Sequence, residues 1–221
     1  MPNWTFCTLE APSDVLKKYI NTDEDGKPRF DFNLVIPRPE IYNDPDLVSG
    51  GHEHAAIKWY LTERGTRSPK PIVTVENKSF GKTLEQAIFS KFDFTTDISN
   101  IERYGDPDKL YEIGKKYVEA FEKYGYYDWY DWSYDNWGTK WNACSCYVDL
   151  MNDEPEYVKF DTAWCYPAPV INKIFDDNPG CYISFTWSDE DYDGTHTICR
   201  KEDGTIEMYT EWEEQEYEEQ E

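Results

Sequence analysis

The amino-acid sequence predicts an α+β fold: a ferredoxin-like antiparallel sheet with helices on one face and a large helical insertion. Three observations lead to this prediction. Strand-like and helical segments follow in the order strand, helix, long helical region, strand, strand, helix and three further strands. The strand-like segments concentrate after residue 143, whereas the longest helical periodicity lies before residue 125. Aromatic residues make up 17% of the chain, which supplies enough apolar surface for helices to cover a sheet.

This order divides the chain into three predicted regions. Residues 1–40 and 126–210 are expected to form the ferredoxin-like sheet domain. Residues 41–125 are expected to form a mainly helical insertion, and residues 211–221 an acidic tail. The tail is almost entirely glutamate, so we expect it to be solvated unless a basic partner orders it.

The sheet domain begins with alternating and apolar segments. Residues 4–9 are predicted to form a strand, followed by a short helix with Ser13 as its N-cap. A second apolar run covers 30–36 and is closed by Pro37. The acidic turn at 23–26 separates these elements.

The insertion contains three predicted helices, at 54–64, 84–92 and 107–124. The last has the clearest boundary signals. Asp106 is suited to the N-cap, Pro107 to the first turn and Gly125 to the C-terminal stop. Its apolar residues recur on one face, as expected for a helix that packs on a neighbour.

Residues 130–141, Tyr-Asp-Trp-Ser-Tyr-Asp-Asn-Trp-Gly-Thr-Lys-Trp, carry the densest aromatic content of the chain. Such a run is expected to be buried, either in the core of the sheet domain or against a partner. Beyond it, strands are predicted at 143–150 and 157–164, and a short helix at 167–175.

The remaining segments predict a strand and then a hairpin. The strand covers 181–187 and is followed by an acidic loop at 189–194. The hairpin joins strands at 195–201 and 205–210 through Glu202-Asp203-Gly204, a strong turn signal.

The formal net charge is −23, from 45 acidic and 22 basic residues. Direct nucleic-acid binding needs clustered Lys and Arg to neutralise phosphates, so the balance argues against it. The same balance argues against anionic membrane surfaces. It favours a basic host protein or nucleoprotein complex as the partner, since the groove of a nucleic-acid-binding protein attracts negative charge. Solubility alone is the other explanation of this acidity.

The six cysteines are interpreted as reduced, small core residues. The opening Met1-Pro2-Asn3-Trp4 has neither a basic start nor an apolar run, so no signal peptide is expected. We therefore expect the protein in the cytoplasm of the host cell.

An enzyme or metal-binding protein is the alternative, centred on Asp161 and the nearby cysteines. Asp161 is the best candidate for a buried acid, although a hydrogen-bond partner for Lys140 or an indole N–H is the simpler interpretation of this residue. Cys144 and Cys146 share a strand face and could bind zinc together with His196 and Cys199. Strand core is the simpler interpretation, and no phosphate loop or nucleophile motif is present. We expect no enzyme, no metal and no cofactor.

Four segments carry a resemblance to a known family. They are Met1-Pro2-Asn3-Trp4, Phe32-Asn33-Leu34-Val35-Ile36-Pro37-Arg38-Pro39-Glu40, Trp132 with Asn136-Trp137-Gly138-Thr139-Lys140-Trp141-Asn142-Ala143, and Phe160-Asp161-Thr162-Ala163-Trp164 with Pro167 and Pro169. Here the chain resembles the YubB-like proteins, a family of phages and other mobile elements with a ferredoxin-like domain. The named residues are 29 of the 221 positions. The resemblance implies the fold, a mobile-element origin and a cytoplasmic setting, and brings no catalytic residue with it.

Charge and resemblance together predict an interaction protein that inhibits a host nucleic-acid-binding defence complex, such as a CRISPR effector. An accessory phage protein without mimicry, whose acidity serves solubility alone, is a further alternative. Its carboxylates would lie where phosphates normally sit, and electrostatic steering would speed docking. The predicted partner-binding residues are Asp189, Glu190, Asp191, Asp193, Glu213, Glu214 and Glu216, with Trp212 and Tyr217 as aromatic anchors.

Overall fold

The computed structural model describes residues 2–47, 52–67, 96–191 and 194–212. The chain forms two compact units. Unit 1 contains Met1–Pro37 and Ser133–Glu221, and unit 2 contains Arg38–Trp132. The predicted helix at 84–92 lies outside the described residues.

Unit 1 is built on an antiparallel sheet of six strands in the order β4-β5-β1-β6-β7-β8. Its strands are β1 (Trp4–Glu10), β4 (Cys144–Met151), β5 (Glu154–Ala163), β6 (Ile183–Asp189), β7 (Gly194–Arg200) and β8 (Ile206–Trp212). The succession β1, α1, β4, β5, α6, β6 with the order β4-β5-β1-β6 is the ferredoxin-like arrangement. The hairpin of β7 and β8 extends this core by two strands, so the predicted fold class is confirmed.

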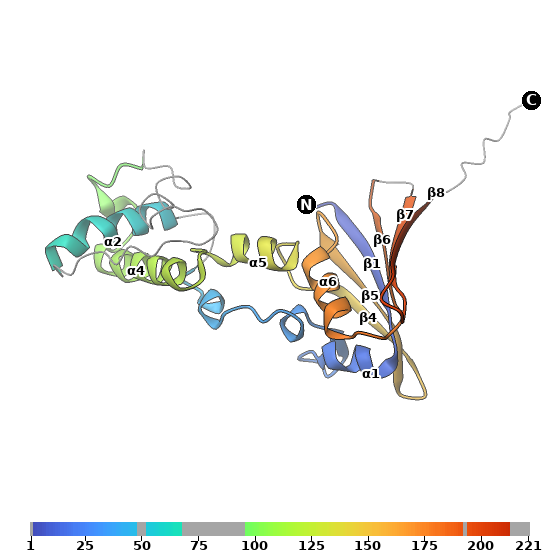
Figure 1. The fold of residues 1–221 in the computed structure, drawn as a ribbon. Helices are drawn as coiled ribbons and strands as arrows, with labels where there is room; N and C mark the ends of the chain where they lie inside the picture. Colours follow the sequence, from blue (N-terminus) through green and yellow to red (C-terminus); the bar gives the residue numbers. More distant parts are fainter. Residues whose placement is uncertain (1, 48–51, 68–95, 192–193, 213–221) are drawn as a thin grey trace, which may run out of the picture. The chain divides into compact units, whose positions relative to one another are not determined.

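The helices α1 (Ser13–Leu16) and α6 (Ala168–Asp177) lie on one side of the sheet (Figure 1). The strand residues facing them are the most deeply buried. Leu9, Phe160 and Phe185 come from the three central strands and are at most 1% exposed. Cross-strand pairing places Leu9 opposite Phe185, and Cys7 opposite Phe160. Apolar area removed from water in this layer is the main stabilising contribution to unit 1.

Ser13 does not cap the first helix as predicted. Pro12 occupies the N-cap position, and Ser13 is the first helical residue. The Ser13 hydroxyl donates instead to the Glu154 carboxylate of β5, and a 3₁₀ turn, η1 (Lys17–Tyr19), continues the helix.

The apolar run predicted at 30–36 is divided between two short elements. Its first residue, Phe30, ends strand β3 (Pro28–Phe30), which pairs with β2 (Ile20–Thr22) in a small antiparallel hairpin. The residues that follow form η2 (Phe32–Leu34), a 3₁₀ helix. Phe30 and Phe32 place their rings 5.0 and 5.7 Å from that of Phe160. Aromatic packing against β5 therefore decides this local structure, with the carboxylate of Asp31 accepting from the Asn33 N–H to start the 3₁₀ turn.

The described residues of unit 2 form helices and short turns. They are η3 (Glu40–Asn43), α2 (Glu53–Arg67), η4 (Ile101–Arg103) and α4 (Pro107–Tyr124). The bounds of α4 coincide with the prediction, because Asp106 accepts from the N–H groups of Asp108 and Lys109 and Gly125 ends the helix with φ +83°. No helix among the described residues has the length and apolar character needed to cross a bilayer.

The helix α5 (Trp129–Trp137) carries the boundary between the units, at Trp132 and Ser133. It forms most of the aromatic stretch, whose predicted burial is correct only in part. Trp132 and Trp137 are buried, whereas Tyr130, Tyr134 and Trp141 are more than a third exposed. A helix of nine residues has two faces, so an aromatic run this dense cannot bury all of its rings on one of them.

Candidate partner-binding surface

Three of the predicted partner-binding residues form an acidic turn that begins at the last residue of β6. Asp189, Glu190 and Asp191 are all exposed. Each accepts a hydrogen bond from the start of β1. The Thr5 hydroxyl donates to Asp189 Oδ1 at 2.6 Å, the Trp4 N–H to Glu190 Oε2 at 2.9 Å, and the Asn3 amide to Asp191. The acidic turn is therefore held in one conformation.

The sheet itself explains this arrangement. Thr5 lies opposite Asp189 in the register of β1 and β6, so the residues that follow β6 run beside the first residues of β1. The Glu190 N–H donates to the Trp4 carbonyl at 2.9 Å and continues the pairing by one residue. A carboxylate has about four acceptor sites, so each acid keeps capacity for a partner's donors.

The other predicted partner-binding residues are less completely described. Trp212 is 65% exposed at the end of β8 and lies opposite Gly194 in the register with β7. The sheet thus brings Trp212 to the same end as the acidic turn. Asp193, Glu213, Glu214, Glu216 and Tyr217 lie outside the described residues.

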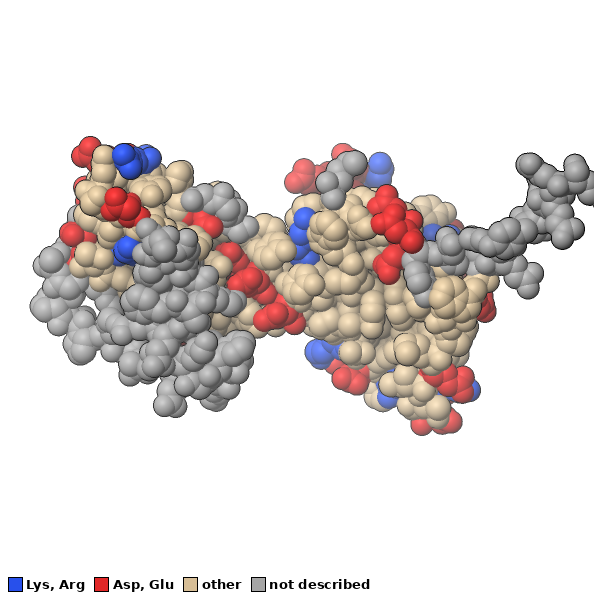
Figure 2. Space-filling model, turned by 90° about the horizontal axis from the view of Figure 1, so that it is seen from above, with Lys and Arg blue, Asp and Glu red and all other residues tan. Residues whose placement is uncertain are grey.

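Figure 2 shows how the acidic side chains of the described residues are distributed over one face. On this face they form several groups separated by uncharged surface, and basic side chains lie next to some of these groups. Among the acidic residues that the structure describes, those of the acidic turn are held by hydrogen bonds from Trp4 and Thr5.

A group of tryptophans with one lysine lies beside the acidic turn, and sequence reasoning did not find it. We name Trp4, Lys140, Trp141 and Trp164 the tryptophan cluster. The Trp4 and Trp141 ring centroids are 6.1 Å apart. Lys140 Nζ lies 3.8 Å from the Trp141 ring centroid and 5.9 Å from that of Trp164. Trp141 is 37% and Trp164 51% exposed.

Buried neighbours in the chain hold the tryptophan cluster in place. The Trp137 indole N–H donates to the Ile36 carbonyl at 2.9 Å. Thr139 is fully buried, and its hydroxyl both donates to the Ala163 carbonyl and accepts from the Ala163 N–H, at 2.9 and 3.2 Å. Gly138, with φ +82°, makes the bend between them. Lys140 and Trp141 are therefore presented from an anchored segment.

Trp164 is fixed from the other side. Its backbone has φ +76°, a left-handed conformation that is rare for a bulky residue. Its N–H donates to the Asn3 carbonyl at 2.9 Å, and the Asn3 side chain donates to Asp191. Asn3 thus joins the tryptophan cluster to the acidic turn.

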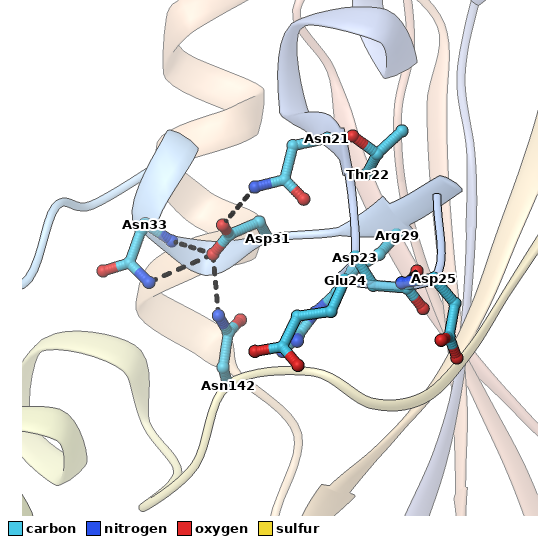
Figure 3. A pocket seen from close by; sticks show the side chains of 9 residues that line it. All are labelled: Asn21, Thr22, Asp23, Glu24, Asp25, Arg29, Asp31, Asn33 and Asn142. Carbon is cyan, nitrogen blue, oxygen red and sulfur yellow. Dashed lines mark hydrogen bonds between the residues drawn. The ribbon is translucent and has the colours of Figure 1, made fainter. Parts of the chain in front are cut away.

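A polar pocket of about 550 Å³ lies elsewhere in unit 1 (Figure 3). Asp31 is its centre. The carboxylate accepts from the side-chain amides of Asn21 and Asn142, both at 2.7 Å, and from the N–H and side chain of Asn33. Burial alone would raise the pKa of Asp31, but hydrogen bonds from Asn142 and Asn33 and the charge of Arg29 lower this pKa overall. Its walls are formed by Asn21, Thr22, Asp23, Glu24, Asp25, Arg29, Asp31, Asn33 and Asn142.

The polar pocket has a structural explanation. Asn142 accepts from the N–H groups of Phe32 and Ala143 while it donates to Asp31, and Arg29 donates to the Ala143 carbonyl at 3.2 Å. These bonds tie the β2–β3 hairpin to the segment before β4. The geometry accounts for the residues without a ligand.

The residues of the zinc alternative are arranged differently from the prediction. His196 lies on the helix-covered side of β7, where its ring stacks on Trp187 at 5.1 Å. Cys199 is three residues further along the strand and therefore points to the opposite face. No group of three or more His, Cys, Asp or Glu side chains suited to a metal occurs among the described residues.

The predicted regular strand around Cys144 and Cys146 is interrupted by a register shift, with Ser145 at φ +49°. The Cys144 thiol donates to the Asn142 carbonyl and the Cys146 thiol to the Phe30 carbonyl. Burial raises the pKa of Cys146 to about 11, which keeps the thiol protonated at neutral pH. Asp161 is half-buried opposite Phe6 and Cys144, and Lys140 lies over Trp141.

Comparisons with known proteins give one distant structural similarity. No family model and no curated protein matches the sequence. Among solved structures, the chain is similar to the crystal structure of protein api92 from Yersinia pseudotuberculosis, assigned to the family model DUF1281. The TM-score is 0.44 at 10% sequence identity, with 96% of this chain and 98% of that chain covered.

Proposed function

We propose that this chain is a phage-type interaction protein whose acidic turn docks in the nucleic-acid-binding groove of a basic host protein. The observation that supports the proposal is that Asp189, Glu190 and Asp191 accept hydrogen bonds from three consecutive residues, Asn3 just before β1 and Trp4 and Thr5 at its start. Carboxylates held in advance lose less conformational freedom on binding than mobile ones. They also offer acceptors to Arg and Lys side chains that normally contact phosphates.

The proposed target is a host defence complex that holds nucleic acid in such a groove, for example a CRISPR effector. The basis for this target class is the resemblance to mobile-element proteins together with the net charge of −23. The protein would then act as an anti-CRISPR nucleic-acid mimic in the host cytoplasm, without catalysis. Trp212, at the same end of the sheet as the acidic turn, is a flanking contact in this proposal.

The test compares two variants that remove the same charge from unit 1. D189N/E190Q/D191N neutralises the acidic turn, and D23N/E24Q/D25N neutralises the hairpin turn between β2 and β3. Both change the net charge equally, so long-range steering changes equally. Binding to a purified CRISPR effector ribonucleoprotein is measured by calorimetry, with target DNA as competitor.

We expect the turn variant to bind at least about tenfold more weakly than the hairpin variant, since it also loses charge-assisted hydrogen bonds. Target DNA should displace the wild-type protein. Equal losses in both variants would show that acidity acts without a specific surface. Absence of binding to the effector at low salt would refute this target class.

A further inference from the structure

We propose that the tryptophan cluster binds an arginine side chain of the basic partner, with the guanidinium stacked on Trp164 and neutralised by the acidic turn. This inference rests on the proposed function, because it assigns the anchor through which the same surface grips its partner. It places the main aromatic contact at Trp164 and Trp141, far from the predicted anchors in the sequence.

The first argument is that the tryptophan cluster already holds a cation. Lys140 Nζ lies 3.8 Å from the Trp141 ring centroid, which is within the range of a cation–π interaction. Its 5.9 Å separation from the Trp164 centroid leaves that ring less engaged. Trp164 is also the more exposed of the two rings, at 51%. The ring is therefore accessible to a second cation.

The second argument is the charge beside the rings. Asn3 accepts from the Trp164 N–H and donates to Asp191, while Trp4 exchanges backbone and side-chain hydrogen bonds with Glu190. Three carboxylates and one ammonium group therefore gather at this end of the sheet. The local charge favours a cation over a phosphate-bearing ligand.

The third argument concerns the chemistry of the cation. A guanidinium group is planar, stacks on aromatic faces and donates several N–H groups in a fixed fork, so it can contact an indole and a carboxylate together. An ammonium group is compact and strongly hydrated, so it gains less from a flat indole. Trp and Arg are also the residue types that dominate binding energy at protein interfaces.

The experiment measures binding of an oligoarginine peptide and an oligolysine peptide of the same length by calorimetry. We expect the arginine peptide to bind more tightly. Trp164→Ala should weaken arginine-peptide binding by about tenfold and lysine-peptide binding less. Tyr182→Ala, an exposed aromatic at the other end of β6, is the matched control and should leave both affinities unchanged. Circular dichroism verifies folding, and Trp141→Ala replaces Trp164→Ala if the latter does not fold.

Replacing Lys140 should change the binding affinity in opposite directions for an arginine peptide and for a phosphate-bearing ligand. Lys140→Met removes the resident cation and should strengthen arginine-peptide binding beyond the effect of Lys27→Met, which removes a lysine from the exposed β2–β3 hairpin. A site for phosphate-bearing ligands would instead be weakened by Lys140→Met.

The outcomes separate this inference from the proposed function. Salt-sensitive peptide binding that Trp164→Ala and Trp141→Ala leave unchanged would overturn the inference and leave the acidic docking surface standing. Failure to bind either peptide would refute both. Binding of an oligothymidine that depends on Trp164 would make the tryptophan cluster a base-stacking site and overturn the inference.

Discussion

At the scale of single residues, Gly138 decides how the segment before β4 is presented. Its φ is +82°, and a Cβ added there would lie 2.8 Å from Pro169 Cδ. Gly180 has the same φ of +82° but no atom within 4 Å of such a Cβ. A Cβ added at either glycine would therefore meet the same backbone strain in different surroundings.

We predict that Gly138→Ala lowers the free energy of unfolding more than Gly180→Ala. A left-handed non-glycine residue costs about 1–2 kcal/mol, which both variants lose, and overpacking against Pro169 adds about 1–3 kcal/mol for Gly138→Ala. Urea unfolding measures both. Equal losses would show that α6 moves away from Gly138 without cost.

The lowered pKa of Asp31 predicts that the stability of the folded protein depends on pH. Because its folded-state pKa lies below the ordinary value of 3.8, its contribution to stability is complete above that value and is lost as the pH falls through the folded-state pKa. Asp31→Asn should therefore lower the melting temperature at pH 7, and the difference from wild type should shrink in strong acid. Asp25→Asn, in the same pocket, is the control and should have little effect at either pH. A difference independent of pH would mean that shape and not charge matters at Asp31.

The acidic turn and the tryptophan cluster differ in what the sequence could reveal. Asp189, Glu190 and Asp191 are consecutive, so their proximity was evident before folding. Trp4, Trp141 and Trp164 are separated by long stretches and meet only because β1 pairs with β5 at its end. The Asn-Trp-Gly-Thr-Lys-Trp run pointed to this region as part of the family resemblance. It did not indicate which of the rings stay exposed.

At the scale of elements, the two long helices of unit 2 pack closely enough to require glycine. A Cβ on Gly114 of α4 would lie 2.1 Å from the Ala56 carbonyl oxygen in the backbone of α2. Ala55, Ala56, Ile101 and Leu110 form a buried cluster beside this contact. Small residues on both helices therefore set their separation.

Gly114→Ala tests this packing. Glycine inside a helix is ordinarily about 1 kcal/mol less favourable than alanine, so propensity alone predicts stabilisation. The contact with Ala56 involves backbone and cannot be relieved by a side-chain rotation, so we predict a net loss of about 1–3 kcal/mol in unfolding free energy. Glu112→Ala, on the exposed side of α4, should change it by less than about 0.5 kcal/mol. Stabilisation by Gly114→Ala would contradict the close approach of the helices.

Elements with local boundary signals were the most predictable. The N-cap Asp106, Pro107 and Gly125 marked α4 because these residues act within one turn of the helix end. The run at 30–36 had no such signal, and contacts with Phe160, distant in sequence, decided its structure. The two faces of α5 likewise decided which aromatic residues of 130–137 are buried.

At the scale of the whole molecule, a net charge of −23 makes the folded chain repel itself at neutral pH. We predict that the melting temperature at pH 7 rises when NaCl is increased from about 20 mM to about 500 mM, because salt screens this repulsion. The control is the same comparison near the sequence pI of 4.4, where salt should have little effect. A melting temperature that falls with salt at pH 7 would show that attractive ion pairs outweigh the repulsion.

The fold class was predictable because the order of elements and the alternation of strands are whole-chain properties. The β-α-β-β-α-β succession survived the insertion of unit 2, since strands pair by register and not by distance along the chain. The surface was less predictable, because total charge does not say where carboxylates gather. Only the pairing of β1 with β6 fixed one group of them.

The outer edge of the sheet, strand β8, exposes all seven of its residues, including Ile206, Met208 and Trp212. Bare edges of this kind can template polymerisation. If two copies joined antiparallel about Tyr209, Glu207 of one would face Glu211 of the other. Glu207 pairs with the exposed Lys201, an ion pair that solvent weakens, so these like charges would still oppose the junction. The repulsion between these glutamates exists only while both carboxylates are ionised. Storage in acidic buffers would remove it and favour growth of fibrous assemblies, so concentrated samples belong at neutral pH.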